Sequence, residues 1–434
     1  MIKLFSVIKN IFSIPELRNR IINTLFFLII FRLGSFVVLP GIDPSKLQDN
    51  ASGIFGLLDT FLGGAFSNAS IFALGIMPYI SASIVVQLLG VTMPYFQKLQ
   101  KEGDSGRKKM NQITRYLTII LTSFQSIAYI SATIPSEAIL VSNKLFFTFS
   151  SVIILVSGTI FCMWLGEKIT DKGIGNGISM LIMIGIISRF PGSLVAEAIS
   201  KGISQALLFI VEIAVLFGVV MFTVMVVKAI RRIPVQYAKQ VIGGNLYGGK
   251  RQYIPLKVNS SGVMPIIFAQ ALMFLPALIG LQFAENSDFF QYIATSFSNM
   301  QSWPYNLTFA LLIILFTFFY TAITINPNQM ADDMKRNNGF IPGIKPGTET
   351  SDFISGVLDK ITLPGSLLLA IIAIFPAFAM MFGVSQSFST FYGGTSLLIM
   401  VGVILDTLQQ IESYLLMRHY DGMMKSGKVK GRSL

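Results

Sequence analysis

The sequence predicts an all-helical integral membrane protein with ten transmembrane helices, and three observations lead to this fold class. The 434 residues are 53% hydrophobic and 12% charged, with a mean hydropathy of +0.67, which leaves too little polar surface for a soluble globule. The apolar runs are continuous and do not alternate, which favours helices over a transmembrane barrel. Basic residues concentrate in every second connection between the runs, as expected for cytoplasmic loops.

The first 20 residues are predicted to form a cytoplasmic amphipathic segment on the membrane surface, or a flexible tail. Apolar residues surround Lys3, Lys9, Arg18 and Arg20. A long apolar core and a small-residue cleavage site are both missing, so we expect no cleaved signal peptide.

Ten runs of 16 or more mostly apolar residues follow, in two groups of five. The first group comprises residues 21–39, 70–93, 116–134, 145–166 and 173–188. The second group comprises residues 205–227, 258–284, 305–325, 361–383 and 394–417.

The distribution of charge orients these spans. Of the 33 Lys and Arg residues, 28 lie in the two terminal segments and the even-numbered connections. The positive-inside rule then places both termini in the cytoplasm. Lys46, Lys144, Arg189 and Lys201 lie on the opposite side, and Arg32 lies within the first span.

The odd number of spans per group predicts two inverted halves with a working site between them. We expect an N-terminal half at residues 21–190, a C-terminal half at 191–417 and a basic cytoplasmic tail at 418–434. Two long cytoplasmic loops, 228–257 and 326–360, belong to the C-terminal half. The first has seven basic and no acidic residues, and the second is rich in Gly and Pro. Such loops suit anionic lipid, an acidic protein partner or a polyanion such as ribosomal RNA, and charge alone leaves these open.

An apolar stretch between the first two spans, GIFGLLDTFLGGAFSNAS at residues 53–70, is too short to cross the membrane. Glycines and Asp59 interrupt it. Two interpretations are open: a re-entrant half-helix buried against protein, or an interfacial helix on the lipid surface.

Isoleucines recur at helical spacing, as Ile76 with Ile80 and Ile182 with Ile186. Facing one cavity, they would form a dry constriction that blocks ions. The same spacing also arises from ordinary packing, so it decides little alone.

Few residues in the spans carry charge: Arg32, Glu212, Asp406 and Glu412. A secondary transporter with an inverted repeat is the alternative function, but it would concentrate carboxylates at the midplane, and these are scattered. One Cys, one His and no hydrolase, zincin or Walker signature argue against an enzyme. We expect no catalytic, cofactor-binding or metal-binding residues.

Several long strings closely resemble the bacterial SecY family, the channel subunits of the Sec protein-secretion translocon. The strings occur in the family's order over about residues 15–430: RLGSFVVLPGID, ASIFALGIMPYISASIVVQLL, KEGDSGRKKMNQITRY, GIGNGISMLI, RRIPVQYAK, PLKVNSSGVMPIIFA, FFYTAITINPNQMADDMKRNNGFIPGIKPG and YGGTSLLIMVGVILD.

This resemblance implies a central pore between two inverted five-helix halves, closed by a re-entrant plug helix at about residues 53–67. It also implies a channel that conducts unfolded polypeptides across the cytoplasmic (inner) membrane of a bacterium and releases transmembrane segments sideways into lipid. The pore ring is expected at Ile76, Ile80, Ile182, Ile186, Ile267 and Ile399. The plug is expected at Gly53, Ile54, Phe55, Leu57, Leu58, Phe61, Leu62 and Phe66. The lateral gate is expected to include Ser81, Ser83, Gln87 and Gln270.

The resemblance further implies the partners SecE, SecG, SecA and the ribosome, and polypeptide substrates that carry signal sequences. Docking is expected at Arg231, Arg232, Lys239, Lys250, Arg251 and Lys345. Two positions depart from the family pattern, since Lys345 and Gln240 replace its usual arginines. Lysine keeps the charge but loses the bidentate fork of arginine.

Overall fold

A computed structural model describes residues 14–47, 59, 62–202, 205–237, 240–242, 245–247, 251–270, 272–273, 288–299 and 301–425. The chain divides into two compact units: unit 1 contains residues 1–196 and 399–434, and unit 2 contains residues 197–398. The predicted half boundaries, at 190/191 and 417, stay a prediction.

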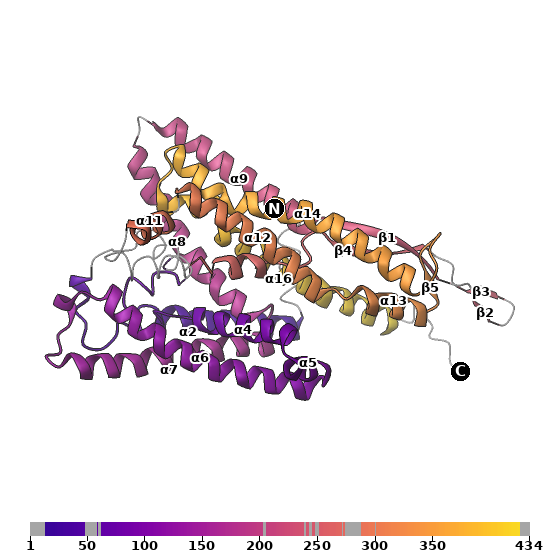
Figure 1. Ribbon diagram of the computed structural model, residues 1–434, viewed down its shortest axis with the longest axis horizontal. Coiled ribbons are helices and arrows are strands. Elements are labelled where there is room, and N and C mark those ends of the chain that lie inside the picture. The colour runs from indigo at the N-terminus through magenta and orange to yellow at the C-terminus, as the bar shows by residue number, and fades with distance from the viewer. Residues whose placement is uncertain are drawn as a thin grey trace. The chain divides into compact units, whose positions relative to one another are not determined.

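Unit 1 is a bundle of long helices. Its elements are α2 (Pro15–Gly34), η1 (Pro44–Lys46), α4 (Met77–Thr92), α5 (Pro94–Lys101), α6 (Asp104–Thr133), η2 (Ser136–Ala138), α7 (Lys144–Lys172), most of α8 (Gly177–Lys201) and most of α16 (Gly394–Lys425). Figure 1 shows α2, α4, α6 and α7 side by side, with α6 packed on α4 and α7.

Local sequence explains where several of these helices begin and end. Asn143 caps α7 by accepting hydrogen bonds from the amides of Leu145 and Phe146. Met93 is extended because Pro94 follows it, so α4 ends there and α5 leaves at an angle of 97°.

Unit 2 combines helices with short strands. Its helices are α9 (Ala206–Lys228), α11 (Asp288–Ser298), α12 (Trp303–Thr324), α13 (Pro327–Arg336), α14 (Thr348–Met381) and α15 (Gln386–Ser389). Its strands are β1 (Ile230–Tyr237), β2 (Gln240–Ile242), β3 (Asn245–Tyr247), β4 (Arg251–Lys257) and β5 (Gly339–Phe340). Helix α14 packs against α12, α13 and α9.

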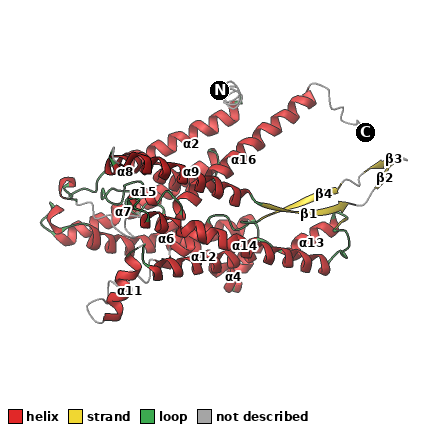
Figure 2. Cartoon of the chain, turned by 90° about the horizontal axis from the view of Figure 1, so that it is seen from above, coloured by secondary structure: helices red, strands yellow, loops and turns green. Residues whose placement is uncertain are grey.

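The predicted helical fold class is confirmed, and the short strands of unit 2 are an addition that the sequence did not predict. The described parts of loop 228–257 include an antiparallel pair of β1 and β4 (Figure 2). Strand β5 adds to β1, in the order β4-β1-β5 (Figure 1). Ile233 and Val235 alternate with exposed residues along β1, a period of two that the charge of this segment obscures.

The membrane-spanning character of the chain is confirmed. Within the described residues, six helices are long and apolar enough to cross a bilayer, or seven if the bent pair α4 and α5 counts as one span. Helices α2 and α6 also lie at predicted spans, although α2 carries charged residues near both ends and α6 carries them near its start. The predicted span 258–284 is only partly described, and the count of ten stays a prediction.

Candidate functional site

The stretch predicted to be the plug is partly described, and that part is buried in unit 1. Leu62 and Phe66 are 5% and 6% exposed. The expected plug residues Gly53, Ile54, Phe55, Leu57, Leu58 and Phe61 lie outside the described residues. We name residues 59–69 the anchored segment, of which the structure describes Asp59 and 62–69.

From Leu62 to Ala69 the anchored segment forms turns, and Asp59 before them is helical. Gly63 and Gly64 adopt φ values of +62° and +93°, which favour glycine and break helical geometry. At its end the Leu39 amide donates to the carbonyl of Ala69 (2.9 Å), which ties the segment to the strand-like residues after α2.

Apolar packing holds one side of the anchored segment. Leu62 and Phe66 belong to a core that includes Tyr129 of α6 and Phe147 of α7. The Tyr129 hydroxyl donates to the carbonyl of Phe66 at 2.6 Å, and the two rings meet edge to face with centroids 4.8 Å apart. The described part is therefore buried against protein, as the re-entrant interpretation expects.

Charged groups hold the other side. The Asp59 carboxylate accepts hydrogen bonds from the amide and hydroxyl of Ser67 (2.8 and 2.9 Å) and forms an ion pair with Arg189 of α8. Arg32 of α2 donates to the carbonyl of Gly63 at 3.0 Å. We name Arg32, Asp59 and Arg189 the arginine cluster.

The six predicted ring isoleucines are all described. Ile76, Ile80, Ile186 and Ile399 are buried, and Ile182 and Ile267 are half-buried. Ile76 precedes the first turn of α4, and the Ile80 amide donates to its carbonyl. Ile267 belongs to unit 2 and the other five to unit 1. That they share one ring stays a prediction.

The predicted lateral-gate residues of α4 form hydrogen bonds within that helix, and Gln270 bonds to another helix of unit 2. Ser81 donates to the carbonyl of Met77, and Gln87 donates to the hydroxyl of Ser83, both within α4 (3.2 Å each). Gln270 is buried in unit 2, where its side chain bonds to Tyr305 of α12. Hydrogen bonds across a gate therefore stay a prediction.

The two long loops that are predicted to be cytoplasmic meet in one compact body, which the sequence did not predict. Gln236 and Tyr237 of β1 pair with Phe340 and Gly339 of β5. Beneath the strands lies an apolar core made of Ile233, Val235, Leu256, Met334, Ile341, Ile354 and Leu358. We call β1, β4, β5, α13 and the first turns of α14 the platform.

The predicted docking residues fall on this platform only in part. Arg231 and Arg232 are exposed on β1, and Arg251 begins β4 opposite Gln236. Lys345 is exposed and lies 3.6 Å from the Glu349 carboxylate, a weak pair. Lys239 and Lys250 lie outside the described residues.

A second charged group is buried in unit 2. Lys201, at the end of α8, lies 3.0 Å from Glu212 of α9 and 3.6 Å from Glu197, and it donates to the carbonyl of Gly383 at 2.7 Å. Glu197 also accepts from the amide of Ser385 at 3.2 Å. We name Glu197, Lys201 and Glu212 the carboxylate cluster.

Sequence reasoning singled out Arg32 and Glu212 as intramembrane charges but not their surroundings. In the sequence, Arg189 and Lys201 stand out only as basic residues on the side predicted to be outside. Their rarity there was the available signal, because a lone basic residue beside a span often has a buried partner. Asp406 and Glu412 are exposed on α16.

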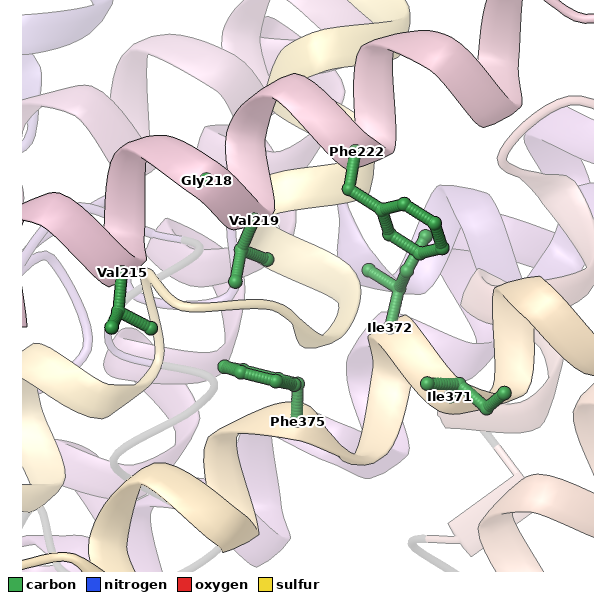
Figure 3. A pocket seen from close by; sticks show the side chains of 7 residues that line it. All are labelled: Val215, Gly218, Val219, Phe222, Ile371, Ile372 and Phe375. Carbon is green, nitrogen blue, oxygen red and sulfur yellow. The ribbon is translucent and has the colours of Figure 1, made fainter.

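An apolar groove of about 360 Å³ lies between α9 and α14 in unit 2 (Figure 3). It is lined by Val215, Gly218, Val219, Phe222, Ile371, Ile372 and Phe375. The lining includes none of the residues singled out in the sequence, and its apolar character suits a surface that faces lipid.

The fold and these sites define a multi-pass helical membrane protein that holds a short apolar segment inside one of its two units. A sequence model of the SecY family matches residues 70–408. The chain is 43% identical to the protein translocase subunit SecY of Streptomyces galbus, over 95% of this chain and 98% of that protein. It is 40% identical to SecY of Chlamydia trachomatis, over 98% and 100% of the two chains. The chain therefore belongs to the SecY family.

Solved structures show the same fold. A structure described as a protein-conducting channel is similar with a TM-score of 0.65 at 17% identity, covering 91% of this chain and 92% of that chain. Canine Sec61, in a ribosome–channel complex, is similar with a TM-score of 0.61 at 17% identity, with the same coverage.

Proposed function

We propose that this chain is the pore subunit of the Sec translocon, which conducts unfolded polypeptides across the bacterial cytoplasmic membrane and releases transmembrane segments sideways into lipid. The observation that carries this proposal is the 43% identity to a protein translocase subunit over nearly the full length of both chains. The charge distribution supports an orientation with both termini in the cytoplasm.

In this mechanism the apolar ring and the plug exclude water from the resting pore. Branched side chains at Ile76, Ile80, Ile182, Ile186, Ile267 and Ile399 are stiff and apolar, so a narrow ring of them sheds water without a charged gate. An extended polypeptide displaces the plug. Apolar segments then leave sideways, because burial in lipid contributes roughly 0.8 kcal/mol per methylene group.

The partners bind at the platform, which lies in the cytoplasm in this orientation, and at the lipid-facing helices. SecA and the ribosome dock on the exposed basic residues of the platform, and SecE and SecG pack on the helices. Rigidity supports docking here, since the core under β1 fixes Arg231 and Arg232 on one strand. Contact with ribosomal RNA would follow from the charge of the same residues.

Reconstitution tests the function. The purified chain, with its partner subunits, is placed in vesicles together with a cytosolic ATPase motor and a secretory precursor. We expect precursor to become protected from added protease only when ATP is present. Vesicles that protect no precursor, yet exchange a small solute against an ion gradient, would support the secondary transporter instead.

The ring can be tested by changing Ile76, Ile80, Ile182 and Ile186 together to Ser. Hydroxyl groups hydrate the constriction, so we expect resting vesicles to leak a small uncharged solute that wild-type vesicles retain. The matched control changes four lipid-exposed residues of α9, Leu207, Ile210, Val211 and Phe217, to Ser. An equal leak from both variants would remove the ring from the mechanism.

Docking can be tested by reversing Arg231 and Arg232 to Glu. If the two side chains contact phosphates, the slope of log affinity for ribosomes against log salt falls by about 2. Lys144→Glu, on the side predicted to be outside, is the control. An unchanged affinity and slope would place ribosome docking elsewhere.

A further inference from the structure

The anchored segment contains one charged residue that the apolar character of a plug does not require. Asp59 is the only charged residue between Gly53 and Ser67. Its side chain is 5% exposed. A buried carboxylate is costly unless it is both paired and hydrogen-bonded, so its position demands a partner.

The bonds of Asp59 are of two kinds. Those from the amide and hydroxyl of Ser67 stay within the anchored segment and would move with it. The ion pair with Arg189 joins the segment to α8, 130 residues further along the chain. The same guanidinium group also donates to the Ser67 hydroxyl at 3.1 Å, so both ends of the Asp59–Ser67 loop meet one arginine.

A second arginine holds the turn itself. Arg32 of α2 donates to the carbonyl of Gly63. A Cβ atom at Gly63 would lie 2.5 Å from the Arg32 guanidinium and 2.7 Å from the Ser188 hydroxyl, and one at Gly64 would lie 2.9 Å from Arg189. The glycine pair therefore lets both arginines reach the backbone closely.

The ion pair between Asp59 and Arg189 has an intermediate strength, which suits a contact that holds the anchored segment and can also break. Asp59 is buried, but the Arg189 side chain is 41% exposed. Buried pairs are costly to break and exposed pairs contribute little, so a pair with one exposed partner lies between these limits. When the segment leaves, Arg189 regains water easily, because part of its side chain is already hydrated.

We propose that Asp59 and Arg189, assisted by Arg32, form an ionic latch that holds the anchored segment in its closed position and sets how readily the channel opens. The proposal rests on the proposed function, in which this segment is the plug. Arg189 and Arg32 act as positioning residues, since their observed contacts are with the segment.

The test measures resting leak and substrate selectivity in reconstituted vesicles. Asp59→Asn and Arg189→Gln each remove one charge, and we expect roughly tenfold faster efflux of a small uncharged solute, as suits a half-buried pair. Both variants should also transport a precursor with a defective signal sequence, because opening no longer needs a strong signal. The controls Glu137→Gln and Lys144→Gln remove exposed charges on the side predicted to be outside.

Two further measurements keep the latch testable if a variant folds poorly. The charge exchange Asp59→Arg with Arg189→Asp should bring efflux back towards the wild-type rate. Wild-type vesicles should leak uncharged solute faster as salt rises, because salt screens the exposed side of the pair. Single variants as tight and as selective as wild type, or leak independent of salt, would overturn the latch. Wild-type vesicles that transport no precursor would instead overturn the proposed function, and the leak assay would still report on the latch.

Discussion

The arginine cluster of unit 1 and the carboxylate cluster of unit 2 both contain buried charge, but they differ in the sign of the excess charge and in exposure to water. The first has two arginines and one carboxylate, and the second has two carboxylates and one lysine. In the first, one arginine side chain is 41% exposed. In the second, Lys201, Glu197 and Glu212 are 9%, 0% and 7% exposed.

The difference teaches what each cluster can do. The arginines grip a turn through one carboxylate and a backbone carbonyl, and water already reaches one of them, so the contact can open. Lys201 joins the end of α8, the start of α9 and the turn after α14, with little access to water. Opening it would strand charges in an apolar surrounding, so we interpret this cluster as a permanent clamp.

The largest predicted effect comes from Lys201→Met. It leaves two buried carboxylates without a cation, so we expect the free energy of unfolding to fall by about 3–5 kcal/mol. Thermal or denaturant unfolding of the purified protein measures this loss. The control Lys228→Met removes an exposed lysine at the end of α9 and should change stability little.

A second substitution distinguishes the role of the carboxylate cluster in stability from the role of the arginine cluster in channel opening. Adding Glu212→Gln to Lys201→Met removes one of the stranded charges and should restore part of the lost stability. The resting leak per folded molecule should stay at the wild-type level in both variants. A leak as large as that of Asp59→Asn would show that the two clusters do not differ in function.

The next effect, in order of size, concerns the turn that the arginines grip. Gly64→Ala places a Cβ at φ +93° and 2.9 Å from Arg189, so we expect the closed position to weaken by about 1–3 kcal/mol. Hydrogen exchange at the amides of residues 62–70 should become faster. The control Gly192→Ala, in α8, meets no atom within 4 Å and should leave that exchange unchanged. Equal exchange in both variants would mean that the close approach at Gly64 is not needed.

The helical membrane fold could be predicted from sequence because hydropathy and loop charge are summed over long windows. The run 145–166 lies inside α7, which extends beyond the apolar residues, and the run 205–227 differs from α9 by one residue at each end. The β1–β4 pair was missed, since its alternation covers few residues and basic side chains hide it. The meeting of β1 with β5 depends on contacts across about 100 residues, which local patterns do not record.

The candidate site divides in the same way. Leu62 and Phe66 could be assigned to a buried segment from apolar character and the family resemblance. The pairing of Asp59 with Arg189 could not, because any of several basic residues on that side could have been the partner. Arg189 is the partner because tertiary packing brings α8 to the anchored segment in the folded chain.

The smallest predicted effect comes from an exposed aspartate–serine turn, which serves as a comparison for the buried turn of Asp59 and Ser67. Asp43 accepts from the amide and hydroxyl of Ser45 (3.1 and 2.6 Å), much as Asp59 does from Ser67. The Asp43 carboxyl is exposed, and among the described residues no arginine forms an ion pair with it. These hydrogen bonds hold the pKa of Asp43 below its ordinary value. The ionised Asp43 carboxylate therefore stabilises the turn at pH values above the ordinary pKa of a carboxyl group, and this stabilisation is lost as pH falls through the lowered pKa.

Hydrogen exchange at the Ser45 amide should be faster in Asp43→Asn than in wild type near neutral pH. The ratio of the two exchange rates should approach one in acid. Resting leak should not change in Asp43→Asn; a rise like that of Asp59→Asn would show that the aspartate–serine turn alone, without burial or arginine, controls the channel.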